Sequence, residues 1–120
     1  MVKMATGKKI EKLDRADYED YDITLIRISD IQSVYTDVTN DYYVLIQQSS
    51  KDNNQPIIHS FPFGKQVRYN LFSFMSNICN KINEARKKIG DDFLLILKHR
   101  DSPKSYKAVY LLSEVEFVVE

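Results

Sequence analysis

The chain has 120 residues, 43% of them hydrophobic and 12% aromatic, which is enough apolar material for one domain with its own core. Its 17 basic and 17 acidic residues cancel, so it lacks the strong positive charge of a typical duplex-binding protein. Cys79 is the single cysteine, which excludes an internal disulfide and suits a reducing compartment. No run approaches the roughly 20 apolar residues of a membrane-spanning helix. We therefore expect a cytoplasmic protein of a bacterial or phage type.

Residues 1–22 are crowded with charges and contain few apolar anchors, among them Ile10, Leu13 and Tyr18. Because so little apolar area cannot offset the entropy of ordering a segment, we expect a flexible tail. The sequence thus predicts one folded domain over residues 23–120.

The next part of the chain has the period-two alternation of β-strands. Strands are expected at residues 23–28, 31–36, 42–47 and 57–63. A polar segment at residues 49–56 separates the last two and is expected to join them as an extended hairpin.

One long amphipathic helix should follow. Apolar residues recur in steps of three or four, which places them on one helix face: Val67, Leu71, Phe74, Ile78, Ile82, Ala85 and Ile89. Gly90 suits the left-handed position that ends such a helix. This face must be buried, and a sheet is its natural partner.

Three β segments complete the pattern. Residues 93–97 form a continuous apolar run, typical of a strand covered on both sides, and residues 106–112 should pair with it as a hairpin. Residues 115–119 either extend that last strand or form a short one of their own. The expected fold is α+β: an antiparallel sheet of about six strands with one long helix packed on one face, in a chain that self-associates as a homodimer or other homo-oligomer.

Enzyme and metal motifs are missing from the sequence. There is no glycine-rich phosphate loop among three glycines, no paired histidine or cysteine metal motif and no nucleophile elbow. His59 and His99 are expected to be ordinary strand residues, Cys79 a small buried hydrophobe, and Asp91 with Asp92 part of a solvated turn. We therefore expect a non-enzymatic protein with no catalytic residues, no cofactor and no metal.

The aromatic residues point to a binding function. Several fall in the expected strands, and nucleobases stack on exposed rings at about 1 to 3 kcal/mol per base. The charge is also uneven, since residues 65–107 contain ten Lys/Arg against four Asp/Glu. The strands themselves contain few cations, so phosphate contacts would have to come from residues around the sheet: Lys65, Arg68, Lys98, Arg100, Lys104 and Lys107.

Residues 35–88 resemble a known repeat. Asp41-Tyr42-Tyr43-x-x-Ile46, a polar loop, a further strand and a long helix are similar to the ββββα repeat of the Pur-alpha-type single-stranded nucleic-acid-binding proteins. The resemblance implies that Tyr43 is a sheet-surface contact and Lys51 a loop contact. This chain departs from the repeat at two points. It lacks the basic strand residues of the repeat, and its hairpin after residue 93 has no counterpart there.

Two functions follow from these observations. The leading expectation is binding of single-stranded nucleic acid through a sheet face and flanking basic loops. The alternative is a protein-interaction module, such as a phage or bacterial inhibitor, immunity or assembly protein. The neutral net charge and the apolar strands suit a protein partner better than a nucleic acid. The two differ in salt dependence, since affinity that rests on phosphate contacts falls steeply with salt.

Overall fold

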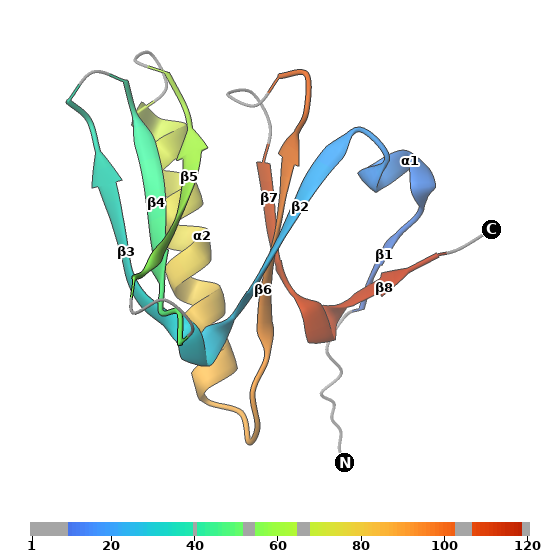
Figure 1. The fold of residues 1–120 in the computed structure, drawn as a ribbon. Helices are drawn as coiled ribbons and strands as arrows, with labels where there is room; N and C mark the ends of the chain where they lie inside the picture. The colour runs from blue at the N-terminus through green and yellow to red at the C-terminus, as the bar shows by residue number, and fades with distance from the viewer. Residues whose placement is uncertain (1–9, 40, 52–54, 65–67, 103–106, 119–120) are drawn as a thin grey trace.

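The computed structural model describes residues 10–39, 41–51, 55–64, 68–102 and 107–118 (Figure 1). Over these residues the fold is α+β, with eight strands, two 3-10 turns (η), one short helix and one long helix. In chain order the elements are β1 (Glu11–Leu13), α1 (Arg15–Tyr18), β2 (Tyr21–Arg27), η1 (Ile28–Asp30), β3 (Ile31–Asp37), β4 (Tyr43–Gln48), β5 (Ile57–Pro62), α2 (Arg68–Arg86), β6 (Phe93–His99), β7 (Lys107–Leu111), η2 (Leu112–Glu114) and β8 (Val115–Phe117).

The expectation of one sheet of about six strands is wrong. The strands form two antiparallel sheets, in the orders β2-β6-β7 and β3-β4-β5, and a parallel pair of β1 with β8. The division occurs at η1, where the Ile28 amide donates to the Asp92 carbonyl at 2.9 Å and so joins the end of β2 to the start of β6. A strand's alternation reports which face is buried but not which strand is its neighbour, so the sequence could not reveal this division.

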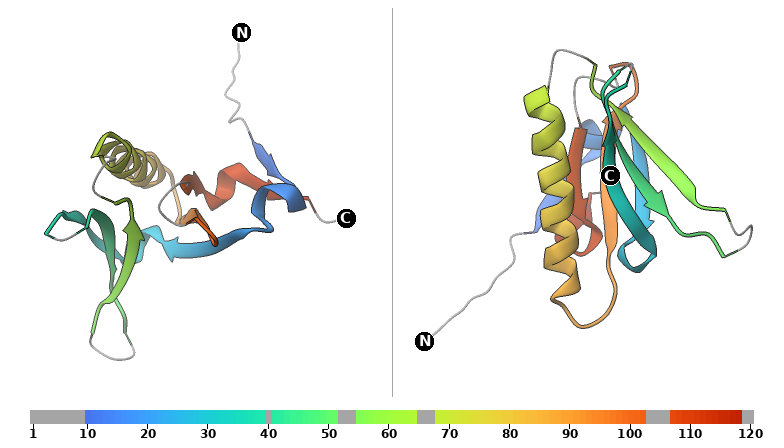
Figure 2. Two further views of the ribbon diagram at one scale, coloured as in Figure 1. Left: turned by 90° about the horizontal axis from the view of Figure 1, so that it is seen from above. Right: turned by 90° about the vertical axis from the view of Figure 1, so that its left-hand side faces the viewer.

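Helix α2 packs against both sheets (Figures 1 and 2). The expected stripe is confirmed at Leu71, Phe74, Ile78, Ile82 and Ala85, which are all buried in the main core.

The two ends of the predicted stripe differ from its middle. Ile89 was predicted to be buried, but it is fully exposed, because α2 ends at Arg86 and the chain turns before Gly90. Gly90 has φ of 97°, the left-handed conformation expected of it, but it does not end the helix as predicted, because α2 already ends at Arg86. Val67 lies outside the described residues.

Strand β6 is buried on both faces, as its continuous apolar run predicted. Leu94 and Ile96 belong to the main core beneath α2, whereas Leu95 and Leu97 belong to a second core on the opposite face. The hairpins β4–β5 and β6–β7 are both antiparallel, as expected.

The second core is closed by the chain's two ends. Leu13 of β1 is buried there, and Tyr18 of α1 meets the Phe117 ring edge-on with 5.5 Å between ring centres. A capping box at Asp14 and Asp17 starts α1. Residues 10–22 were expected to belong to a flexible tail, but here they form part of the folded domain, because Leu13, Tyr18 and Tyr21 pack in the second core with Leu95 and Leu97. Residues 1–9 lie outside the described residues.

We predict that Phe74→Ala lowers the free energy of unfolding by about 3 to 5 kcal/mol, because Phe74 fills the core against Phe61 and Phe63. The matched control is Phe72→Ala two residues earlier, where the ring is 58% exposed and the change should stay within about 0.5 kcal/mol. Chemical denaturation measures both. Equal midpoints for the two variants would mean that α2 is not packed in this orientation.

A second pair of variants tests whether the N-terminal residues belong to the domain. Leu13→Ala should cost about 2 to 5 kcal/mol because it opens the second core, whereas Ile10→Ala removes an exposed side chain and should cost little. An unchanged denaturation midpoint for Leu13→Ala would contradict this packing.

Candidate nucleic-acid interface

Strand direction brings most of the predicted binding residues to one end of the fold, the upper end in Figure 1. β4 and β7 begin at this end, α2 also begins there, and β6 ends there. The backbone positions gathered in this way are Tyr43, Arg68, Lys98, Arg100 and Lys107. Lys51 lies beyond the far end of β4, at the opposite end of the sheet, and Lys65 and Lys104 lie outside the described residues.

Two lysines face each other across neighbouring strands at this end. The register of β6 with β7 sets Lys98 directly opposite Lys107. Antiparallel partners have Cα atoms about 4.5 to 5.5 Å apart, and like charges in such pairs destabilise a sheet. Lys98 is half-buried and forms no salt bridge with any described residue. The register thus places two basic residues in paired positions at this end of the sheet.

Arg100 adds a third cation just beyond the end of β6. Its Nε lies 3.2 Å from the Asp22 carboxylate, and its Nη2 donates to the Tyr21 carbonyl at 3.2 Å. Asp22 is also the register partner of Lys98 on the other side of β6, but its salt bridge is to Arg100. Both members of this salt bridge are more than half exposed, so the bond contributes little and an anionic ligand can replace it.

The start of α2 contributes to the same electrostatic environment. A helix N-terminus has a partial positive charge, which acidic residues of the first turn normally offset. Helix α2 begins at Arg68 and has no acidic residue in its first turn. The partial charge therefore has the same sign as the cations at this end of the fold (Figure 1). We refer to Arg68, Lys98, Arg100 and Lys107 together as the basic end.

Tyr43 lies on the outward face of the β3-β4-β5 sheet. Val44 and Ile46 point into the core, so Tyr43, Leu45 and Gln47 point outward, and the register places Tyr35 beside Leu45. Among the described residues of β3, β4 and β5, none is Lys or Arg. This face can stack on a base, but it cannot neutralise a phosphate.

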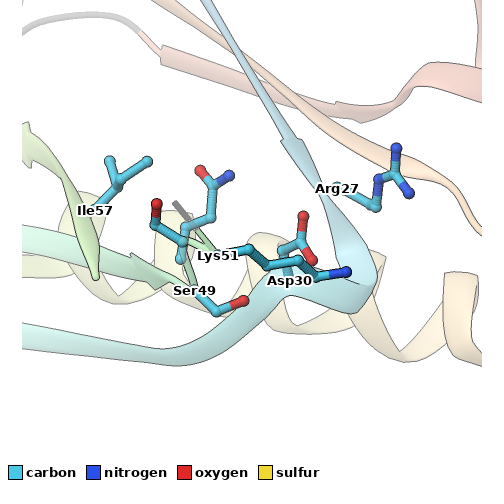
Figure 3. A pocket seen from close by; sticks show the side chains of 7 residues that line it. Arg27, Asp30, Ser49, Lys51 and Ile57 are labelled. Atoms are coloured by element: carbon cyan, nitrogen blue, oxygen red, sulfur yellow. The ribbon is translucent and has the colours of Figure 1, made fainter. Parts of the chain in front are cut away.

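A polar cavity of about 370 Å³ lies near the other end of β4 (Figure 3). It forms where η1 meets the end of β4 and the start of β5, and the Ser49 amide donates to the Asp30 carbonyl there at 2.8 Å. Its lining consists of Arg27, Asp30, Gln48, Ser49, Ser50, Lys51 and Ile57. Lys51, predicted as a loop contact, is thus separated from the basic end by the length of β4.

The two histidines do not form a pair, because they lie in different sheets. His59 bonds through Nε2 to Gln48 Oε1 at 2.7 Å, and burial lowers its pKa. His99 accepts the amides of Asp101 and Ser102 at Nδ1 and so shapes the turn after β6. Within the described part of the chain, no group of three or more His, Cys, Asp or Glu side chains could hold a metal ion.

Cys79 and Asp92 both differ from what their sequence context suggests. Cys79 is half-buried and lines a cavity of about 200 Å³ between β3 and α2, so it is not the core residue that we expected.

Asp92 was expected in a solvated turn, but it is buried. It accepts from Ser113 Oγ at 2.5 Å and from the Phe93 amide at 2.8 Å, and it lies 3.6 Å from Lys88 Nζ. Asp91 remains exposed, as expected, and accepts from Ser29 Oγ at 2.8 Å. The sequence pattern gave no sign that Ser113, 21 residues away, folds back onto this turn.

Comparisons with protein-family models, curated proteins and solved structures find no match for this chain. No helix within the described residues has the length and apolar character needed to cross a membrane.

The Asp92 contacts predict a pH dependence of stability. Burial raises the pKa of Asp92, but the hydrogen bonds from Ser113 and Phe93 and the charge of Lys88 outweigh it, so the pKa lies below the ordinary value of 3.8. A lowered carboxyl pKa stabilises the fold above the unfolded-state value, and this stability is lost as pH falls through the folded-state value. Asp92→Asn should therefore lower the free energy of unfolding at pH 7. It should also make the loss of stability below about pH 3.8 smaller than in the unmodified protein, as measured by denaturation over a pH series. Exposed Asp101→Asn is the control, and equal pH profiles for the two variants would contradict this role.

Proposed function

We propose that this protein binds single-stranded nucleic acid, with the basic end contacting phosphates and Tyr43 stacking on a base. The observation that carries the proposal is the juxtaposition of Lys98 with Lys107 across β6 and β7. A sequence that keeps like charges in register accepts a cost in stability, and such violations of local rules are typical of functional sites. A bound phosphate removes this cost because it lies between the two positive charges.

The surrounding groups favour a single strand over a duplex. The whole chain is neutral, so its affinity must come from a local cluster of cations. Tyr43 lies on an outward sheet face without cations, and a ring in this position can stack only on a base that is unpaired and accessible. The resemblance to the Pur-alpha-type repeat supports the same function and assigns the same tyrosine.

The cation variants are the first test. Lys98→Gln and Lys107→Gln should each weaken binding of a short single-stranded oligonucleotide and reduce the slope of log affinity against log salt by roughly 0.7 per lost contact. The control is Lys87→Gln, an exposed lysine beyond the opposite end of α2, which should change neither quantity. Fluorescence anisotropy over a salt series measures both.

The same two variants distinguish a binding role from a structural one. If the lysines repel each other in the free protein, removing either charge should leave the thermal midpoint unchanged or raise it, even as binding is lost. Loss of stability in Lys98→Gln would instead indicate that the lysine supports the fold.

The tyrosine is tested separately. Tyr43→Ala should weaken oligonucleotide binding by about 1 to 3 kcal/mol through lost stacking, with the salt slope unchanged. Phe72→Ala removes an exposed ring elsewhere on the surface and should have no effect. The proposal is wrong if the unmodified protein binds neither single-stranded DNA nor RNA below about 100 µM at low salt, a range that non-specific binders reach.

One observation favours a second function. Tyr35 and Ile58 are both exposed on the outward face of the β3-β4-β5 sheet, where Tyr35 pairs with Leu45 and Ile58 pairs with Gln47. A face with exposed apolar side chains and no cations suits a protein partner, as the alternative expectation holds. Binding of such a partner should persist at high salt and should be lost in Tyr35→Ala, whereas nucleic-acid binding should fall with salt.

A further inference from the structure

We propose that the cavity beside η1 is a binding site for a phosphoryl group, separate from the basic end and independent of the function proposed above. At about 370 Å³ it lies in the size range of small-molecule sites. Six of its seven lining residues are polar, and two of these are cations, Arg27 and Lys51. Figure 3 shows the Lys51 side chain extending from the end of β4 toward Asp30 and Arg27.

The cationic wall is held in place by contacts outside the cavity. Arg27 Nε lies 3.8 Å from Asp91 Oδ2, and its guanidinium carbon lies 5.5 Å from the centre of the Phe93 ring. Asp91 is itself held by Ser29 Oγ at 2.8 Å, a hydrogen bond that lowers its pKa and keeps it charged. The Arg27 side chain is 55% exposed, so this surface salt bridge orients the guanidinium and leaves it accessible to an anion.

The opposite wall supplies further donors. Gln48 Oε1 is hydrogen-bonded to His59 Nε2 at 2.7 Å, so the Gln48 side chain can offer its NH2 group as a donor to the cavity. The Ser49 and Ser50 hydroxyls and the Lys51 ammonium lie next to it in the lining. Donors of this kind around a cation are the chemistry that binds phosphoryl oxygens.

Asp30 restricts the class of ligand. Its carboxylate is the single anionic group of the lining, and it favours a ligand that brings a hydrogen-bond donor together with its phosphoryl group. A nucleotide does this, because its ribose hydroxyls lie close to the phosphate. Ile57, which is exposed at the edge of the cavity, offers an apolar surface for the base. The phosphoryl group can come from a free nucleotide or from the phosphorylated end of a nucleic-acid strand.

The test is a titration of the full chain followed by NMR, with inorganic phosphate, AMP and AMP's nucleoside, adenosine, as probes. AMP should shift the amides of Ser49, Ser50 and Lys51, inorganic phosphate should do so more weakly, and adenosine should not. Lys51→Gln should weaken AMP binding by about tenfold or more, as expected for loss of a charged hydrogen bond. Lys87→Gln is the matched control and should bind AMP as the unmodified protein does.

The source of the phosphoryl group is decided by a second pair of probes, the same oligonucleotide with and without a 5′-phosphate. If the ligand is the phosphorylated end of a strand, the 5′-phosphate should strengthen binding to the unmodified protein but not to Lys51→Gln. If the ligand is a free nucleotide, the 5′-phosphate should make no such difference.

The proposal is overturned if AMP shifts none of the three amides, or if Lys51→Gln and the unmodified protein bind AMP equally. If AMP does not bind but the oligonucleotide does, the cavity proposal fails and the proposed function of the basic end stands. If AMP binds but the oligonucleotide does not, the cavity proposal stands and the proposed function of the basic end fails.

Discussion

The burial of β6 on both faces is the constraint around which the other elements are arranged. Its side chains point alternately into two separate cores, so one face requires α2 and the other requires β1, α1 and β8. A run of apolar residues of this kind cannot lie at a surface, because each side left uncovered would expose several large side chains to water. The pairing of β2 and β7 on its two edges then follows, since the backbone groups of a buried strand must also be satisfied.

This arrangement determines where the charged residues lie. Since β6 runs away from the α2–β6 turn, its polar end lies at the same end of the domain as the start of α2 (Figure 1), and the hairpin to β7 brings Lys107 back into register with Lys98. The other end of the strand is held by Asp92, whose carboxylate and carbonyl join Lys88 of the turn after α2 to β6, η1 and η2. One end of the domain is thus closed by a satisfied polar network, and the other end collects the basic residues of the basic end.

The sequence predicted those features that depend on one element at a time. The stripe of α2 from Leu71 to Ala85, the double burial of β6 and the alternation of β4 all follow from periodicity, and each is present. Features that depend on distant segments could not be read in this way. The division into two sheets depends on the contact of Ile28 with Asp92, and the folding of residues 10–22 depends on Leu13 reaching Leu95 and Leu97.

The candidate interface was predictable to a similar degree. The excess of cations after residue 65 is visible in the sequence, but the pairing of Lys98 with Lys107 exists only in the register of two strands, and the separation of Lys51 from them follows from the direction of β4. NMR mapping of a single-stranded oligonucleotide on the labelled protein is the direct test of the proposed interface. Amide shifts should be concentrated at Tyr43, at the start of α2 and around Lys98, Arg100 and Lys107. Shifts confined to the outward face of β3, β4 and β5, or no shifts at saturating oligonucleotide, would contradict it.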